Sequence, residues 1–336
     1  MLRAGRNGTL ARMSEKTDWT FPEELQPKAG ALDFDFEHVL RSVVLLRAEV
    51  PEDAFTADVL GTDRVGSGIV IRPDGLVLTI GYLITEATTI WLTTVDGTVV
   101  PAHPLAYDSV TGFGLVAPLG RVSLPALELG SAASIAVGGN AVVVSHGGRG
   151  HTLAAKLIDK REFAGYWEYL LDEALFTAPA HPHWSGAALV GMDGKLLGVG
   201  SLLVQESVGS ETIDANMFVP IDLLPPILND LISKGRVSRA PRPWLGLSAA
   251  ESQGQLVVGS LSVDAPAAKA GIKPGDRVLE VAGQRVDGLS DLLRKVWRLG
   301  PAGTEIPLTL GRGQQRSRVQ VRSTDRDLML KKPQLH

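Results

Sequence analysis

A serine that could act as a nucleophile lies in the segment 181–190. Ser185 precedes Gly186 and a small-residue step into an apolar strand, so we expect its hydroxyl on a tight turn at the start of that strand. Acyl transfer by a serine needs a base within hydrogen-bond reach and an acid that orients the base. His181 and His183 flank the serine in sequence. We consider them as replacement bases, but surface loop residues are the favoured interpretation.

The other residues offer little further chemistry. His146 and His151 bracket a glycine-rich loop that lacks the helix-opening Lys-Ser/Thr of a phosphate-binding loop, and His103 is expected in a loop. The His-x-His pair before the serine has no third ligand nearby, so we expect no metal site. No cofactor is implied. The chain has no cysteine, which excludes disulfides, thiolate metal sites and cysteine nucleophiles.

Length and composition indicate a globular protein. The 336 residues suggest two domains, and 44% hydrophobic with 21% charged residues is ordinary for such chains. The net charge of −4 and the absence of a Lys/Arg cluster argue against nucleic-acid binding. No stretch approaches the ~18 apolar residues of a membrane span. The segment 1–30 lacks the apolar region of a signal peptide, so we predict a cytoplasmic protein.

Periodicity predicts mostly β structure. From residue 43, short β-branched runs alternate with turn dipeptides such as Asp96-Gly97 and Asp193-Gly194, as in a barrel or sandwich. A helix is expected over 221–234, with Asp222 as its N-cap and Gly235 at its end. The segment 236–243 has two prolines and no apolar run, which is typical of a linker.

Several motifs resemble HtrA-type (DegP/DegS-like) trypsin-fold serine proteases. Gly-Ser-Gly-Ile-Val-Ile at 66–71 and Pro-Asp-Gly-Leu-Val-Leu-Thr at 73–79 follow the family's first-barrel pattern. The resemblance implies a chymotrypsin-like double β-barrel over 35–235, preceded by an N-terminal arm at 1–34. The family nucleophile segment reads Gly-Asn-Ser-Gly-Gly-Pro-Leu-Val. Four of its positions match here: Ser185, Gly186, Leu189 and Val190.

The same resemblance places unusual residues at the other catalytic positions. Tyr82 stands where the family has histidine, and Gly112 stands where it has aspartate. A phenol with a pKa near 10 is not a base for a serine, and a glycine orients nothing. Asp108, four residues before Gly112, is considered as a displaced acid. Of the two oxyanion-hole positions, Ser185 is kept, but His183 replaces a glycine, which places the hole in doubt.

The segment 244–325 resembles a PDZ domain. It opens on Trp-Leu-Gly-Leu and contains Pro-Ala-x-x-Ala-Gly-x-x-Pro-Gly-Asp at family spacing. The resemblance implies an α+β domain that binds peptide C-termini by strand addition. Leu245, Gly246 and Leu247 would form the carboxylate loop. On a helix expected at 290–299, three residues would line the pocket for the last side chain or only pack the core: Leu293, Val296 and Trp297.

Three further expectations concern this domain. Arg242 is considered as an added charge near the bound carboxylate. An apolar pocket would prefer peptides ending in Val, Leu or a similar residue. The segment 326–336 is expected to be a solvated tail, although its last residues, 333–336, could occupy the groove instead.

These observations predict a protease-dead HtrA-type homologue, with unfolded or C-terminally exposed polypeptides as its partners. It would act as a scaffold, chaperone or adaptor in protein quality control. One alternative is an active but unorthodox serine endopeptidase that uses Ser185 with a non-family base. Another is a structural subunit that assembles with an active homologue. Because the relatives are trimers, we expect a homo-oligomer.

Overall fold

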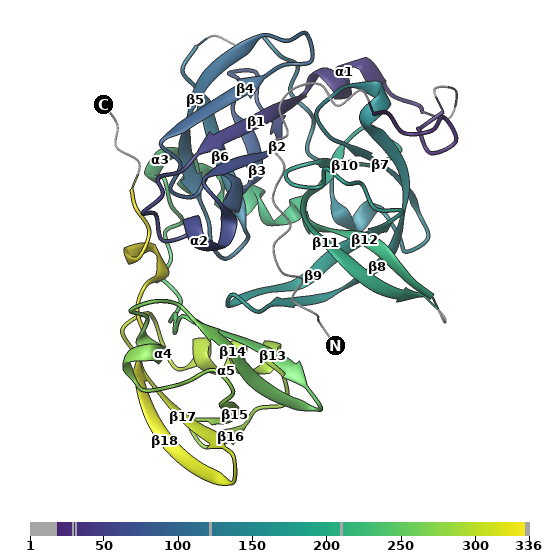
Figure 1. The fold of residues 1–336 in the computed structure, drawn as a ribbon. Coiled ribbons are helices and arrows are strands. Elements are labelled where there is room, and N and C mark those ends of the chain that lie inside the picture. The colour runs from purple at the N-terminus through teal and green to yellow at the C-terminus, as the bar shows by residue number, and fades with distance from the viewer. Residues whose placement is uncertain (1–18, 29, 31, 121–122, 209–210, 333–336) are drawn as a thin grey trace.

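The computed structural model describes residues 19–28, 30, 32–120, 123–208 and 211–332, and these form two closed β-barrels followed by a six-stranded sheet (Figure 1). The expected fold class, mostly β with a double barrel and an α+β domain, is confirmed. Residues 1–18, 29 and 31 of the expected arm lie outside the described residues. Among the helices that the structure describes, none is long and apolar enough to cross a bilayer.

The first barrel follows a short helix, α1 (Phe36–Arg41), whose N-cap Asp35 accepts a hydrogen bond from the His38 N–H. Its strands are hydrogen-bonded in the order β1-β2-β3-β6-β5-β4. A second short helix is α2 (Ala57–Leu60). The strands are β1 (Val43–Glu49), β2 (Asp63–Val70), β3 (Val77–Ile80), β4 (Thr89–Thr93), β5 (Val99–Tyr107) and β6 (Phe113–Pro118).

The second barrel has the order β10-β11-β12-β9-β8-β7. One apolar cluster runs through both barrels, and its largest fully buried side chains include Phe113 and Phe176. The strands are β7 (Asn140–Val144), β8 (Thr152–Gly165), β9 (Tyr169–Ala178), β10 (Ala188–Val190), β11 (Leu196–Val208) and β12 (Glu211–Pro220). The β8–β9 hairpin extends from this barrel toward the last domain (Figure 1).

The expected helix at 221–234 is two elements: a 3₁₀ turn at Ile221–Leu223 and α3 (Pro225–Lys234). Asp222 does not cap α3, because its carboxylate accepts hydrogen bonds from the Ser131 hydroxyl and the Ala132 N–H. The two prolines open α3, where their missing N–H groups cost nothing. Gly235 ends it at φ +69°, as expected.

The last sheet has the order β13-β14-β15-β17-β18, with β16 beside β15, and encloses its own apolar core. The expected helix at 290–299 is α5 (Leu289–Arg298). The other helix is α4 (Pro266–Lys269). The strands are β13 (Leu247–Ser252), β14 (Gln255–Leu261), β15 (Arg277–Val281), β16 (Gln284–Arg285), β17 (Glu305–Arg312) and β18 (Gln315–Arg322).

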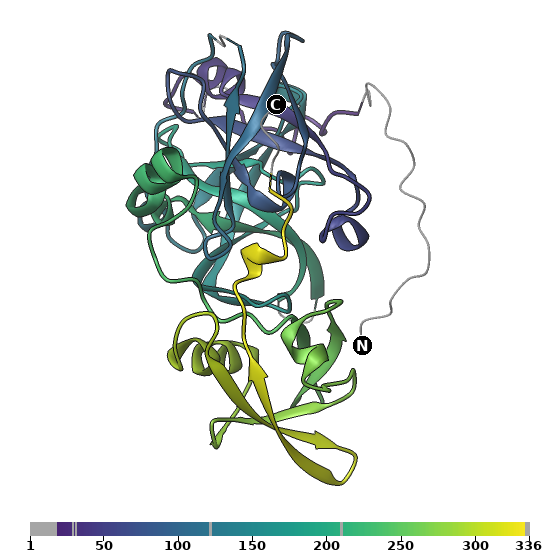
Figure 2. The same ribbon diagram turned by 90° about the vertical axis from the view of Figure 1, so that its left-hand side faces the viewer.

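The chain after β18 returns to the first barrel instead of extending into solvent (Figure 2). The Lys331 N–H donates to Glu86 Oε1 at 2.9 Å, and the Lys331 ammonium pairs with Asp53. The predicted tail is therefore tethered to the first barrel through Lys331, although Leu328, Lys331 and Lys332 are exposed to solvent. Residues 333–336, considered as a groove occupant, lie outside the described residues.

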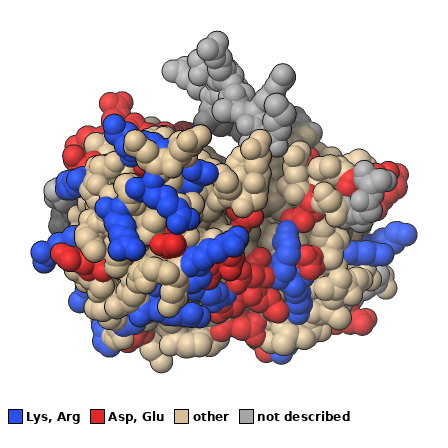
Figure 3. All heavy atoms as spheres, turned by 90° about the horizontal axis from the view of Figure 1, so that it is seen from below, with Lys and Arg blue, Asp and Glu red and all other residues tan. Residues whose placement is uncertain are grey.

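On the face seen from below, basic and acidic side chains are interspersed (Figure 3).

Candidate active site

The Ser185 turn is held between strands of both barrels. The Ser185 carbonyl accepts a hydrogen bond from the Ser67 N–H of β2 at 2.8 Å, and the Gly186 N–H donates to Gly200 of β11 at 2.9 Å. Gly186 has φ +74°, and a Cβ there would collide with the Ser67 carbonyl. Only glycine suits this position, and the expected tight turn is present.

Tyr82 lies directly beside the serine. It belongs to a 3₁₀ turn, Gly81–Leu83, that follows β3. Its phenol oxygen is 2.8 Å from Ser185 Oγ and 2.8 Å from the Ser201 carbonyl oxygen. The phenol has one proton, and a carbonyl can only accept. We therefore assign the phenol proton to Ser201, so that the Ser185 hydroxyl donates to the phenol oxygen.

This arrangement does not activate the serine. Burial raises the pKa of Tyr82 to about 12, so the phenol remains neutral at physiological pH. A general base works best when its pKa lies near the operating pH. The neutral phenol holds the serine hydroxyl in place but does not remove its proton.

Gly112, expected at the family's aspartate position, has no side chain, and the Tyr169 phenol occupies the space beside it. Gly112 has φ +83°, and a Cβ there would lie 2.9 Å from the Tyr169 phenol oxygen. Tyr169, the first residue of β9, donates to the Thr111 carbonyl at 2.7 Å. The Gly112 carbonyl accepts the Gly81 N–H at 2.7 Å, beside Tyr82. The backbone that would carry the acid is thus still next to the turn that would carry the base.

The Asp108 carboxylate binds neighbouring residues and has a structural role. Its buried carboxylate accepts from the Thr111 N–H at 3.0 Å and the Thr111 hydroxyl at 2.8 Å, and it pairs with Arg239 of the linker. Within the described part of the chain, no hydrogen bond joins Asp108 to Ser185 or to a histidine. The structure does not support a displaced catalytic acid at this position.

His181 is neither a surface residue nor a base for Ser185. Its Nδ1 accepts the His183 N–H at 2.9 Å, and its Nε2 lies 2.9 Å from the His151 carbonyl. The residue is fully buried, and burial lowers the pKa of His181 to about 4. Both ring nitrogens are engaged away from the serine. The expectation of a surface loop residue is wrong for His181 because aromatic residues from the N-terminal segment, such as Phe21, cover it.

The His183 N–H, expected at an oxyanion-hole position, points inward. Because it donates to His181 Nδ1, it does not face a substrate oxygen. The His183 ring stacks on His146 with centroids 5.4 Å apart, and its buried Nδ1 has no hydrogen-bond partner among the residues that the structure describes. The other expected donor of the oxyanion hole, the Ser185 N–H, therefore lacks the second donor that the His183 N–H was expected to supply.

Four histidines and Trp19 form one cluster that sequence reasoning missed. The Trp19 ring lies 4.6 Å from His151 and 5.2 Å from His183, centroid to centroid. The only signal in the sequence is that two loops each contain two histidines: His146, His151, His181 and His183. No group of three or more ligands arranged for a metal occurs among the described residues. His146 Nδ1 contacts the Ser67 hydroxyl at 3.1 Å, but Ser67 is fully buried.

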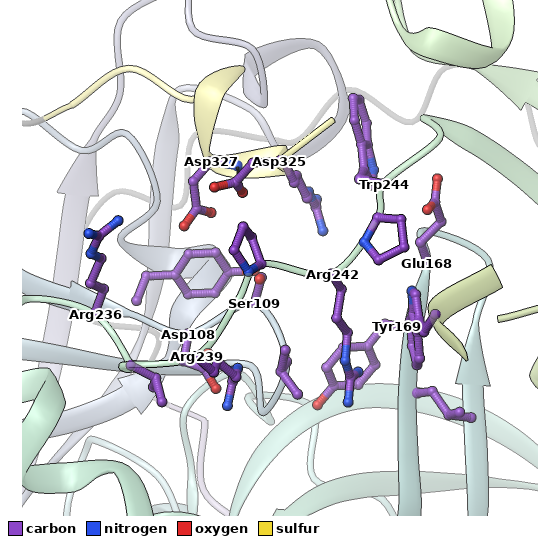
Figure 4. Close-up of a pocket in the computed structure, with 18 residues that line it drawn as sticks. Asp108, Ser109, Glu168, Tyr169, Arg236, Arg239, Arg242, Trp244, Asp325 and Asp327 are labelled. Atoms are coloured by element: carbon purple, nitrogen blue, oxygen red, sulfur yellow. Dashed lines mark hydrogen bonds and ion pairs between the residues drawn. The ribbon is translucent and has the colours of Figure 1, made fainter. Parts of the chain in front are cut away.

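The expected carboxylate loop, Leu245–Leu247, already holds a carboxylate. Glu168 Oε1 accepts the N–H groups of Leu245, Gly246 and Leu247 at 3.1, 2.6 and 3.2 Å. Sequence reasoning missed Glu168, because the contact spans 77 or more residues. Glu168 lines a cavity of about 90 Å³ between the barrels and the last domain (Figure 4).

The expected pocket residues lie on α5. Leu293 and Val296 are buried, with 2% and 1% of their surface exposed, and Val296 belongs to the domain's apolar core. Trp297 is partly buried and packs against that core. Arg242 lies over the Trp297 ring, 4.0 Å from its centroid, so its nearest described partner is an aromatic face rather than a carboxylate.

Comparisons with known proteins agree with this architecture. Residues 66–199 match the trypsin-like peptidase domain, and residues 243–322 match the PDZ domain. A probable periplasmic serine endoprotease, DegP-like, from Halomonas elongata is 29% identical over 270 residues, which cover 76% of this chain and 56% of that protein. The putative serine protease HhoB from Synechocystis is 24% identical over 76% of this chain and 65% of its own length. The chain spans about half the length of most of the curated relatives described for it.

Solved structures show the same fold. The HtrA-type protease AlgW with a decapeptide superposes with a TM-score of 0.52 at 20% identity, over 89% of this chain and 98% of that one. A serine endoprotease from Yersinia pestis has a TM-score of 0.50 at 22% identity, over 87% and 98%. The predicted cytoplasmic location is wrong, because relatives from Halomonas, Bartonella and Pseudomonas are named periplasmic endoproteases.

Proposed function

Because the chain is an HtrA-type protein, with a trypsin-like peptidase domain followed by a PDZ domain, we propose that it binds polypeptides without cleaving them. The contact between the Tyr82 phenol and Ser185 Oγ carries this proposal. Loss of the serine or histidine of a triad lowers turnover about a million-fold. Here Gly112 and the inward-pointing His183 N–H remove two further parts of the machinery.

The PDZ domain supplies the binding activity of the proposal. A loop in which three successive N–H groups face one carboxylate is suited to a peptide C-terminus. The barrels then serve as a scaffold that presents this domain to unfolded or C-terminally exposed polypeptides, as a chaperone or adaptor in quality control. Likeness to relatives named periplasmic supports a periplasmic location, and we propose a homo-oligomer with a trimer as the expected state.

The test is incubation of the purified protein with casein, beside a Ser185→Ala variant under identical conditions. We expect neither protein to degrade casein and both to bind it or keep it soluble. Degradation that disappears with Ser185 would refute the proposal and favour an unorthodox serine endopeptidase with a non-family base. A protein that neither degrades nor retains casein would refute the binding role.

A further inference from the structure

The loop 245–247 is built as a carboxylate site. Gly246 has φ +71°, and a Cβ there would collide with Ala265. Successive N–H groups around such a left-handed residue converge into an anion-binding concavity. The three N–H groups meet at Glu168 Oε1, and Oε2 accepts the Leu245 N–H at 3.0 Å.

Glu168 is placed in this loop by the tip of the β8–β9 hairpin. It has φ +62°, a conformation that residues other than glycine adopt only when their surroundings impose it. Its neighbours in sequence anchor the tip, since the Trp167 and Tyr169 rings stack with centroids 5.7 Å apart. The occupant of the loop is therefore a preorganised part of the barrel domain.

The same hairpin also binds the other wall of the peptide groove. Arg294 of α5 pairs with Glu162 of β8 and with Asp172 of β9, the latter at 2.7 Å. Helix α5 packs against both strands. The carboxylate loop and the groove helix are thus held by one hairpin.

This inference rests on the function proposed above. We propose that Glu168 is an internal ligand of the PDZ domain, and that a polypeptide with a free C-terminal carboxylate binds to loop 245–247 only by displacing it. One nest of N–H groups holds one carboxylate, so the two ligands exclude each other. Tyr169, next to Glu168, is hydrogen-bonded to the Thr111 carbonyl beside Gly112, so the hairpin tip is also tied to the first barrel.

The balance at the loop suits an exchangeable ligand. Burial raises the pKa of the Glu168 carboxyl to about 7, against the opposite effect of its three N–H donors. The free-energy cost of desolvating the Glu168 carboxylate thus offsets much of the stabilisation that its hydrogen bonds provide. A peptide carboxylate that brings additional side-chain contacts can compete with it.

The binding experiment uses the full chain at pH 8, above the pKa of about 7 of the Glu168 carboxyl, so that Glu168 and the peptide carboxyl are both ionised. The probes are fluorescein-labelled decapeptides ending in Val, Leu or Phe, each with a free carboxylate or an amidated C-terminus. We expect Glu168→Ala to bind the free-carboxylate peptides at least tenfold more tightly than wild type, because the apparent Kd scales inversely with the fraction of empty loops. Glu173→Ala, at an exposed position on β9, is the matched control and should bind as wild type does.

A second measurement needs no peptide. Hydrogen exchange of the amides 245–247 should accelerate at least tenfold in Glu168→Ala and not in Glu173→Ala, since these amides lose their acceptor. Unchanged exchange, or equal measurable affinity of wild type and Glu168→Ala for free-carboxylate peptides, overturns the internal ligand and leaves the proposed function standing. Accelerated exchange without binding of any peptide keeps the internal ligand and refutes the proposed function.

Discussion

An aspartate at position 112, where the family resemblance predicts one, should destabilise the protein rather than prepare it for catalysis. Gly112→Asp introduces a side chain at φ +83°, where its Cβ would lie 2.9 Å from the Tyr169 phenol oxygen and 3.4 Å from the ring carbon that bears it. The phenol must move, and its bond to the Thr111 carbonyl is then lost. Both costs arise from the folded state.

The magnitude follows from these two costs. A left-handed conformation costs a residue with a Cβ about 1–2 kcal/mol. A buried acceptor left without its donor costs about 1–3 kcal/mol, and Thr111 is buried. The free energy of unfolding should therefore fall by roughly 2–5 kcal/mol, a large part of the ~5–15 kcal/mol typical of natural proteins.

Urea unfolding followed by circular dichroism would measure this loss. Gly138→Asp is the matched control, because Gly138 has φ +87° and open space around its Cβ position. It pays the backbone cost alone. Tyr169→Phe in the Gly112→Asp background should recover about 1 kcal/mol or more relative to additivity, since it removes the colliding hydroxyl.

Two results would refute this reasoning. Equal losses in Gly112→Asp and Gly138→Asp would show that the phenol does not occupy the acid's space. Additive effects of Gly112→Asp and Tyr169→Phe would show that the two residues do not compete for it.

Three further predictions concern the same barrels. Tyr82→Phe should lower the free energy of unfolding, measured in urea, by about 1–3 kcal/mol, because the buried Ser201 carbonyl loses its donor. Tyr166→Phe, at an exposed position, should have no effect. Equal effects of the two substitutions would contradict the hydrogen bond assigned to Tyr82. Tyr82→His alone should not produce casein cleavage, because Gly112 still supplies no acid; any Ser185-dependent cleavage would contradict this. Burial lowers the pKa of His181 to about 4, so on acidification the unfolded state takes up this proton before the folded state does. The contribution of His181 to the free energy of unfolding should therefore be full above pH 6.5 and fall by about 3 kcal/mol between pH 6.5 and 4. His181→Gln should reduce this decline in urea unfolding at pH 7.5 and 5, and equal declines in both proteins would refute the prediction.

The fold was predictable because its signals are local. The segment Gly-Ser-Gly-Ile-Val-Ile forms the last part of β2 and Ile71 after it, and Trp-Leu-Gly-Leu opens the last domain. Short motifs and the family resemblance that they carry therefore located both folded units. The turn at Gly186 was predictable because its backbone conformation and close contacts allow only glycine at that position. The resemblance to HtrA-type proteases is confirmed. The roles given to Tyr82 and Gly112 remain predictions.

The missed features depend on contacts between distant segments. Nothing in the composition of the β8–β9 tip indicates that Glu168 reaches a loop 77 residues later. His181 looks like a loop residue until Trp19 and Phe21, 160 or more positions earlier, are packed over it. Asp222 resembles a helix cap, but its carboxylate accepts hydrogen bonds from Ser131 and Ala132, about 90 residues earlier. Side-chain pairing across the fold decides each case.

The phenol of Tyr169 in the space beside Gly112 has an evolutionary consequence. A return to proteolysis would need an acid at 112, a changed residue at 169, a base at 82 and a freed N–H at 183. We expect no single one of these changes to restore proteolysis, and we expect the first one to lower stability. Under the function proposed above, loss of the triad would therefore be difficult to reverse by single substitutions. Ser185 can persist through it without selection for catalysis, since its hydroxyl serves as a hydrogen-bond partner for Tyr82.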